Sequence, residues 1–122
     1  GHPAGDEVLR AVGRILKQST RSAGDVVARF GGEEFVVLLP NTRLAQAEAI
    51  AEKIRRYMSH HIFGEGENSF QVTISIGVVQ VNNGDGESAV KAADDNLYRA
   101  KKAGRDRVVA SLVHRHGSLE CV

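Results

Sequence analysis

The chain has 122 residues, with 16 Lys and Arg against 15 Asp and Glu and a formal net charge of +1. This length suits one domain with its own core, and the balanced charge gives no overall field that favours nucleic acid or an anionic membrane. The apolar runs are too short to span a bilayer. The single cysteine, Cys121, cannot form an internal disulfide, which fits a reducing cytosol. We therefore expect a cytoplasmic segment with no membrane contact, in a protein that could itself be membrane-anchored.

The first half of the sequence predicts a helix, a hairpin and a second helix. Apolar residues recur at helical spacing over 7–18, and Asp6 stands where an N-cap or a first-turn acid belongs. Val26–Leu39 contains two apolar runs separated by Gly-Gly-Glu-Glu, which is typical of two strands joined by an acidic turn. Thr42 is then placed to cap a helix whose apolar face extends to Met58.

The second half predicts a strand, a helix and a last strand. Apolar and polar residues alternate over 70–76 as in a half-buried strand, which Val78–Val81 extends. A helical pattern over 87–103 ends at Gly104, a residue suited to a helix C-terminus. Residues 107–112 are apolar enough for a short final strand.

The last residues show no periodicity, so we expect a tail over 113–122 after a single domain of residues 1–112. The predicted order is helix, strand, strand, helix, strand, helix, strand. This order implies an α+β fold in which helices cover one or both faces of a mainly antiparallel sheet.

The acidic turn has two explanations of about equal weight. Glu33 and Glu34 are adjacent carboxylates that could simply face water or could bind Mg²⁺ or Ca²⁺, which prefer carboxylate oxygen. Gly31 and Gly32 favour a ligand slightly, because a backbone without side chains can be approached closely.

Cations gather at the end of the last predicted helix, at Lys101, Lys102 and Arg105. Their position complements the helix dipole, and this alone would explain them. The functional alternative is that they bind phosphate oxygens, the arginine in a bidentate manner. Asp95 and Arg99 have the spacing of an ordinary ion pair on a helix surface, and we assign them no function.

Four segments carry motifs in a fixed order. They are Gly1-His2-x-x-Gly5-Asp6-x-x-Leu9, Arg29-Phe-Gly-Gly-Glu-Glu-Phe35, Ser75-Ile-Gly-Val78 and Leu97-Tyr-x-Ala-Lys-x-x-Gly-Arg-x-Arg-Val108. Together they resemble the GGDEF family of diguanylate cyclases, in its Glu variant, over nearly everything from Gly1 to Val109. The resemblance implies a nucleotidyl-cyclase or ferredoxin-like sheet.

The resemblance also implies an activity and partners. Two GTP molecules would be condensed into cyclic di-GMP, a second messenger, with release of two pyrophosphates. Each domain would hold one GTP, and two domains would meet face to face as a homodimer. An upstream sensor domain outside this chain would regulate the reaction. The alternative within the family is a non-catalytic module that binds nucleotide or a protein partner.

The residues at the hairpin receive roles from the same resemblance. Glu33 would be a metal ligand near the attacking 3′-hydroxyl, in a complete site that holds two Mg²⁺ ions. Glu34 would support the site. Gly31 and Gly32 would let the nucleotide lie against the turn.

Three residues far from the hairpin in sequence would bind the substrate. Asp6 would accept hydrogen bonds from the N–H groups of the guanine edge. Lys101 and Arg105 would hold the β- and γ-phosphates.

The sequence departs from the family before its first residue. Family members begin with a central strand that carries another metal-binding aspartate, followed by a helix with a guanine-reading asparagine, and this sequence starts at Gly1, after both. Either the chain is truncated or these residues precede this numbering. If they are absent, the sheet lacks its first central strand and has unpaired edges, and the site has half its metal ligands. We then expect residues 1–122 to be inactive alone.

A second departure concerns product inhibition. Many members carry Arg-x-x-Asp before the Gly-Gly, and this pair binds the product as an inhibitor. Asp25 is correctly placed, but Ser22 occupies the arginine position and Arg21 lies one residue earlier. We therefore expect weak or absent inhibition through Arg21 and Asp25.

Overall fold

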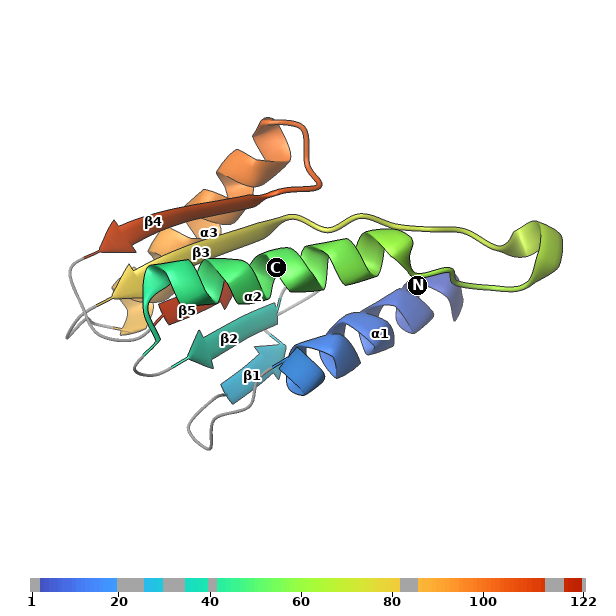
Figure 1. The fold of residues 1–122 in the computed structure, drawn as a ribbon, viewed down its shortest axis with the longest axis horizontal. Coiled ribbons are helices and arrows are strands. Elements are labelled where there is room, and N and C mark those ends of the chain that lie inside the picture. Colours follow the sequence, from blue (N-terminus) through green and yellow to red (C-terminus); the bar gives the residue numbers. More distant parts are fainter. Residues whose placement is uncertain are drawn as a thin grey trace.

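Helices cover both faces of a five-stranded sheet in the computed structural model (Figure 1). The structure describes residues 3–19, 26–29, 35–39, 42–81, 86–113 and 118–121. Along the chain the elements are α1 (Pro3–Ser19), β1 (Val26–Arg29), β2 (Phe35–Leu39), α2 (Leu44–His60), a 3₁₀ turn (Gly66–Asn68), β3 (Ile76–Val81), α3 (Gly86–Lys102), β4 (Val108–Val113) and β5 (Ser118–Cys121). The three predicted helices and the hairpin are therefore confirmed.

The strands lie in the order β1-β2-β5-β3-β4. Neighbouring strands are antiparallel except for β3 and β4, which α3 joins as a parallel pair. An α-helical crossover is the usual way to connect adjacent parallel strands. The predicted α+β fold with a mainly antiparallel sheet is confirmed for the described strands.

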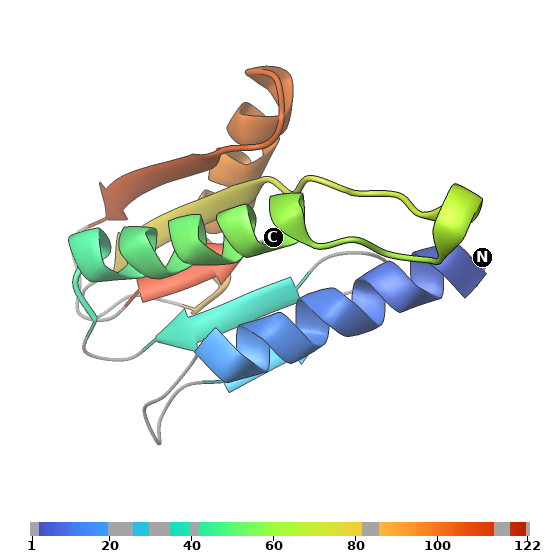
Figure 2. The ribbon, with the colours of Figure 1, turned by 45° about the vertical axis from the view of Figure 1, so that its right-hand side comes forward.

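The core has one part on each face of the sheet. On one face, α1 and α2 pack side by side over buried side chains of β3, including Ile76 and Val78 (Figures 1 and 2). On the other face, α3 packs on Val79 through Ala89, Ala93 and Leu97. Because side chains of a strand alternate between faces, β3 contributes to both parts. This strand is the element against which the two layers of helices are placed.

At Gly77 the backbone of α3 lies directly against the sheet. A Cβ atom at this position would overlap the carbonyl oxygen of Ala93 and the backbone nitrogen of Leu97. The glycine of the Ser-Ile-Gly-Val motif therefore allows the backbone of α3 to lie directly on β3, because no side chain stands between them.

A buried amide fixes α3 to both parallel strands. Asn96 is 1% exposed, and its Nδ2 donates to the Val78 carbonyl at 2.9 Å and to Ser111 Oγ at 2.8 Å. Arg99 donates to Asn96 Oδ1 at 3.3 Å. The predicted ion pair between Asp95 and Arg99 is therefore wrong, because the guanidinium turns toward the amide one residue further along.

The starts of β3 and α2 differ from the predictions. Strand β3 begins only at Ile76, because neither β4 nor β5 extends alongside residues 71–75. Residues 71–75 are thus not part of the strand, but the apolar side chains of the predicted alternation, Val72 and Ile74, still pack against the core. Helix α2 has Arg43 rather than Thr42 as its N-cap, without a side-chain capping bond, and Gln80 Oε1 accepts from the Leu44 N–H at 2.6 Å. A side chain of the sheet thus satisfies one of the first N–H groups of the helix, which have no partner within the helix itself.

The largest difference concerns the C-terminal residues. Ser118–Cys121 forms β5, which lies between β2 and β3 and pairs with both over four residues. We expected a tail there, and we expected unpaired edges if the central strand were absent. Main-chain hydrogen bonds depend little on side-chain pattern, so a segment without periodicity can still pair. The domain division at residue 112 stays a prediction.

Candidate functional site

The described residues that flank or belong to the predicted site lie toward one end of the sheet. The end of β1 and the start of β2 lie there, on either side of residues 30–34, because Arg29 pairs with Phe35. The same end contains the start of β3 and the start of β4, where Ile76 pairs with Val108. The turn from α3 into β4 also lies there, since the Ile76 N–H donates to the Arg107 carbonyl at 3.0 Å.

Asp6 lies in the first turn of α1 and is exposed. The helix begins earlier than predicted, at Pro3, so Asp6 is a helical residue rather than the N-cap. An acid in the first turn is favoured by the helix dipole. In both views the N-terminal end of α1 points in the same general direction as the start of β2 (Figures 1 and 2).

Lys101 and Arg105 are exposed at the C-terminal end of α3. Within the described part of the chain, neither side chain forms a hydrogen bond or ion pair, whereas Lys102 Nζ lies 5.5 Å from the centre of the Tyr98 ring. The two cations are therefore available to an anion that approaches this end of the sheet.

The turn that carries Arg105 has an unusual backbone. Gly104 ends α3 as predicted, with the Arg105 N–H donating to the Ala100 carbonyl at 2.9 Å and the Gly104 N–H to the Lys101 carbonyl at 3.4 Å. Arg105 and Asp106 then have φ angles of 61° and 47°. Each left-handed residue other than glycine costs about 1–2 kcal/mol, so other contacts must stabilise this turn.

The other predicted site residues lie outside the described residues. They are Gly31, Gly32, Glu33 and Glu34 of the hairpin and the doubtful inhibitory pair Arg21 and Asp25. Among the described residues, no three His, Cys, Asp or Glu side chains come close enough together to hold a metal ion. The predicted metal site at Glu33 is thus neither supported nor contradicted by this result.

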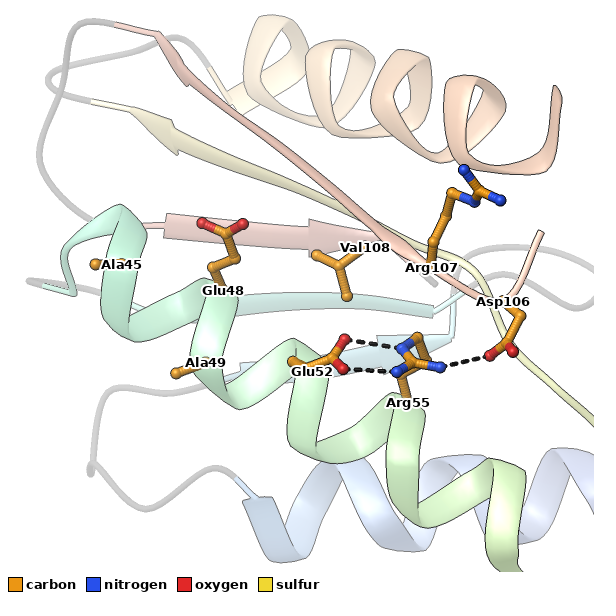
Figure 3. Close-up of a pocket in the computed structure, with 8 residues that line it drawn as sticks. All are labelled: Ala45, Glu48, Ala49, Glu52, Arg55, Asp106, Arg107 and Val108. Atoms are coloured by element: carbon orange, nitrogen blue, oxygen red, sulfur yellow. Dashed lines mark hydrogen bonds and ion pairs between the residues drawn. The ribbon is translucent and has the colours of Figure 1, made fainter. Parts of the chain in front are cut away.

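A groove of about 510 Å³ lies between α2 and the start of β4 (Figure 3). Arg55 lies inside it between two carboxylates: its Nε and Nη2 donate to Glu52 at 2.8 and 2.6 Å, and its Nη1 donates to Asp106 at 2.7 Å. The spacing of Glu52 and Arg55 on one helix could have predicted their pair. No sequence signal indicates that Asp106, 51 positions away, completes it.

This network shifts two pKa values. Hydrogen bonds from Arg55 lower the pKa of Glu52 from 4.5 to about 2, with partial burial opposing the shift and attraction to Arg55 and Arg56 adding to it. The hydrogen bonds to Glu52 and Asp106 raise the pKa of Arg55, so this guanidinium is always charged.

The lowered pKa predicts a pH-dependent contribution of Glu52 to stability. The pKa of the Glu52 carboxyl is 4.5 in the unfolded chain and about 2 in the folded chain. The ionised carboxylate therefore stabilises the fold fully above pH 4.5, and this stabilisation is lost as the pH falls from 4.5 through 2. Because the side chain is 36% exposed, we expect only about 0.5–1 kcal/mol at neutral pH.

Urea unfolding of Glu52→Gln and of the unmodified chain at several pH values measures this effect. The difference in unfolding free energy should be constant near neutral pH and shrink toward zero at about pH 2–3. A difference that persists unchanged at the acidic end would contradict the assigned pairing.

Comparison with known proteins matches residues 1–107 to the family described as "Diguanylate cyclase, GGDEF domain". Diguanylate cyclase A of Treponema denticola is 47% identical over 114 residues, covering 91% of this chain and 30% of that protein. The chain spans less than a third of the length of this curated relative. No helix in the described ranges is both long and apolar enough to cross a membrane.

Solved structures show the same fold. The active GGEEF domain of a diguanylate cyclase from Vibrio cholerae superposes with a TM-score of 0.79 and 32% identity, covering 90% of this chain and 70% of that one. The diguanylate cyclase SiaD of Pseudomonas aeruginosa, solved with its activator SiaC, gives 0.81 and 36% over 91% of this chain and 43% of that one. On sequence, fold and motif order, this chain belongs to the family of diguanylate cyclase GGDEF domains.

Proposed function

We propose that this domain condenses two GTP molecules into cyclic di-GMP with release of pyrophosphate. The observation that carries the proposal is the pair of exposed cations, Lys101 and Arg105, at the end of the sheet where β1 ends and β2 begins, on either side of the Gly-Gly-Glu-Glu sequence. Nucleotidyl transfer depends mainly on positioning and on neutralising charge, and this end of the domain offers groups for both.

The described residues would divide the binding of GTP between base and phosphates. Lys101 and Arg105 would contact the β- and γ-phosphates, the arginine through two of its N–H groups. Asp6 would accept from the ring N–H and the exocyclic amine of guanine. Adenine has neither donor in that arrangement, so the carboxylate would select GTP over ATP.

The hairpin would supply the reacting end of the site. Gly31 and Gly32 would let the nucleotide approach the backbone, and Glu33, supported by Glu34, would bind Mg²⁺, whose preference for carboxylate oxygen fits this donor set. Two Mg²⁺ ions, when bound, would activate the 3′-hydroxyl and stabilise the leaving pyrophosphate.

The remaining partners follow from the reaction. Because each domain would hold one GTP, the active form would be a homodimer in which two such sites face each other, regulated by a sensor domain elsewhere in the protein. The relative SiaD is controlled by a protein activator, which is a precedent for regulation from outside the catalytic domain. We place this domain in the cytoplasm, with weak or no product inhibition through Arg21 and Asp25.

The full-length protein that carries this sequence tests the function directly. With GTP and Mg²⁺, chromatography should show cyclic di-GMP and pyrophosphate, and ATP should give no cyclic product. GTP-dependent thermal stabilisation without product would instead indicate the non-catalytic binding module. Absence of both product and stabilisation would refute nucleotide binding altogether.

A further inference from the structure

The strained turn between α3 and β4 is bonded to distant elements in two ways, through the backbone bond from Ile76 to Arg107 and through one side-chain ion pair. Local bonds hold its backbone, including the donation from Arg107 Nε to the Arg105 carbonyl at 3.0 Å. The Asp106 side chain instead accepts from Arg55 Nη1 on α2, at 2.7 Å. Among the described residues, this ion pair is the only side-chain bond that ties the turn to another layer of the fold.

Arg55 is itself held in one orientation before it reaches the turn. The two bonds to Glu52 fix the plane of its guanidinium, and the side chain is only 19% exposed (Figure 3). Because the guanidinium of Arg55 is already oriented, it loses less conformational entropy when it binds the Asp106 carboxylate than an unrestrained side chain would. Figure 3 also shows Arg107 pointing away from Asp106, so Arg55 meets Asp106 without competition from it.

The geometry points to Glu52 and Arg55 as positioning residues for the triphosphate of GTP. We propose that they hold Asp106 in its left-handed conformation and thereby fix the direction in which the neighbouring Arg105 side chain leaves the backbone. This inference rests on the proposed function, because it assumes that Arg105 contacts the β- and γ-phosphates. The proposed binding site for GTP would then depend on two residues of α2 that act through Asp106 and Arg105 without touching nucleotide or metal themselves.

The consequence is specific to the phosphates. Without the ion pair, φ of Arg105 and Asp106 can relax toward common values, which displaces the guanidinium of Arg105. Bidentate binding of a phosphate tolerates little displacement. Guanine recognition at Asp6, on a different helix, is left unchanged.

The test compares a ligand with these phosphates and one without them. In the full-length protein, Arg55→Gln should raise the KM for GTP about tenfold and leave the inhibition constant of GMP, which lacks the β- and γ-phosphates, unchanged. Arg56→Gln is the matched control: Arg56 Nε also donates to Glu52, at 3.1 Å, but the side chain is 71% exposed and does not contact the turn. It should behave as the unmodified protein.

Two further variants separate positioning from general stability. Arg55→Gln combined with Arg105→Ala should have the same KM for GTP as Arg105→Ala alone, since Arg55 acts only through Arg105. Asp106→Gly removes the same contact from its exposed side. Because glycine adopts positive and negative φ about equally, nothing then holds the turn in its left-handed conformation, so KM for GTP should rise without weaker binding of GMP, even if Arg55→Gln folds poorly.

The outcomes distinguish this inference from the proposed function. If the unmodified protein neither binds nor converts GTP, the function fails. If it does, but Arg55→Gln and Asp106→Gly match it, or weaken GTP and GMP equally, then Glu52 and Arg55 are structural only and the inference is overturned. An additive KM increase in the Arg55 and Arg105 double variant would overturn it as well.

Discussion

Glu33→Gln should reduce cyclic di-GMP formation about a thousandfold or more while the protein still binds GTP. The substitution keeps the size of the side chain and removes the negative charge, and a neutral amide is a much poorer ligand for Mg²⁺ than a carboxylate. Charge stabilisation by a catalytic metal contributes several kcal/mol, which corresponds to this loss in rate. Initial rates of product formation in the full-length protein at saturating GTP measure the effect.

Glu34→Gln is the matched control, because the same change occurs one position along the same turn. If Glu33 is the direct ligand and Glu34 only supports the site, the loss for Glu34→Gln should be at least tenfold smaller. Comparable losses would show that both acids act together, and a fully active Glu33→Gln would contradict the assignment of the metal ligand. Both variants should show the thermal midpoint of the unmodified protein.

The elements that could be predicted from sequence are those whose pattern is local. Helices α1, α2 and α3 each repeat apolar residues on one face, and the hairpin has apolar runs on both sides of its glycines. Gly104 was recognised as a helix end because the left-handed C-terminal motif favours glycine. In each of these cases the local sequence is enough to determine the secondary structure.

The features that escaped prediction depend on distant partners. Strand β5 has no pattern of its own and is defined by the open edges of β2 and β3. Asn96 is buried because two strands present an acceptor carbonyl and a hydroxyl to it. Lys101 and Arg105 are predicted as site residues from their charge and motif, which are local, whereas the contact of Arg55 depends on Asp106, which only the folded chain brings near.

Gly77→Ala should destabilise the domain by about 1–3 kcal/mol, although it adds a single methyl group. The new Cβ would overlap backbone atoms of Ala93 and Leu97, and the Asn96 carbonyl carbon would lie 2.9 Å away. Backbone of a packed helix cannot rotate aside as a flexible side chain can, so α3 must move off β3 as a unit. That movement would also strain the bonds from Asn96 to Val78 and Ser111.

Gly5→Ala is the matched control, because the same methyl group is added on α1 where no heavy atom lies within 4 Å. Alanine favours a helix over glycine, so this variant should be as stable as the unmodified chain or slightly more stable. Thermal unfolding should separate the two, with a midpoint about 5–15 °C lower for Gly77→Ala. Equal midpoints would mean that α3 can move away from β3 at little cost. Since α3 carries Lys101 and leads into the Arg105 turn, such a movable helix could not hold both cations in a fixed position relative to the ends of β1 and β2 that flank the Gly-Gly-Glu-Glu sequence.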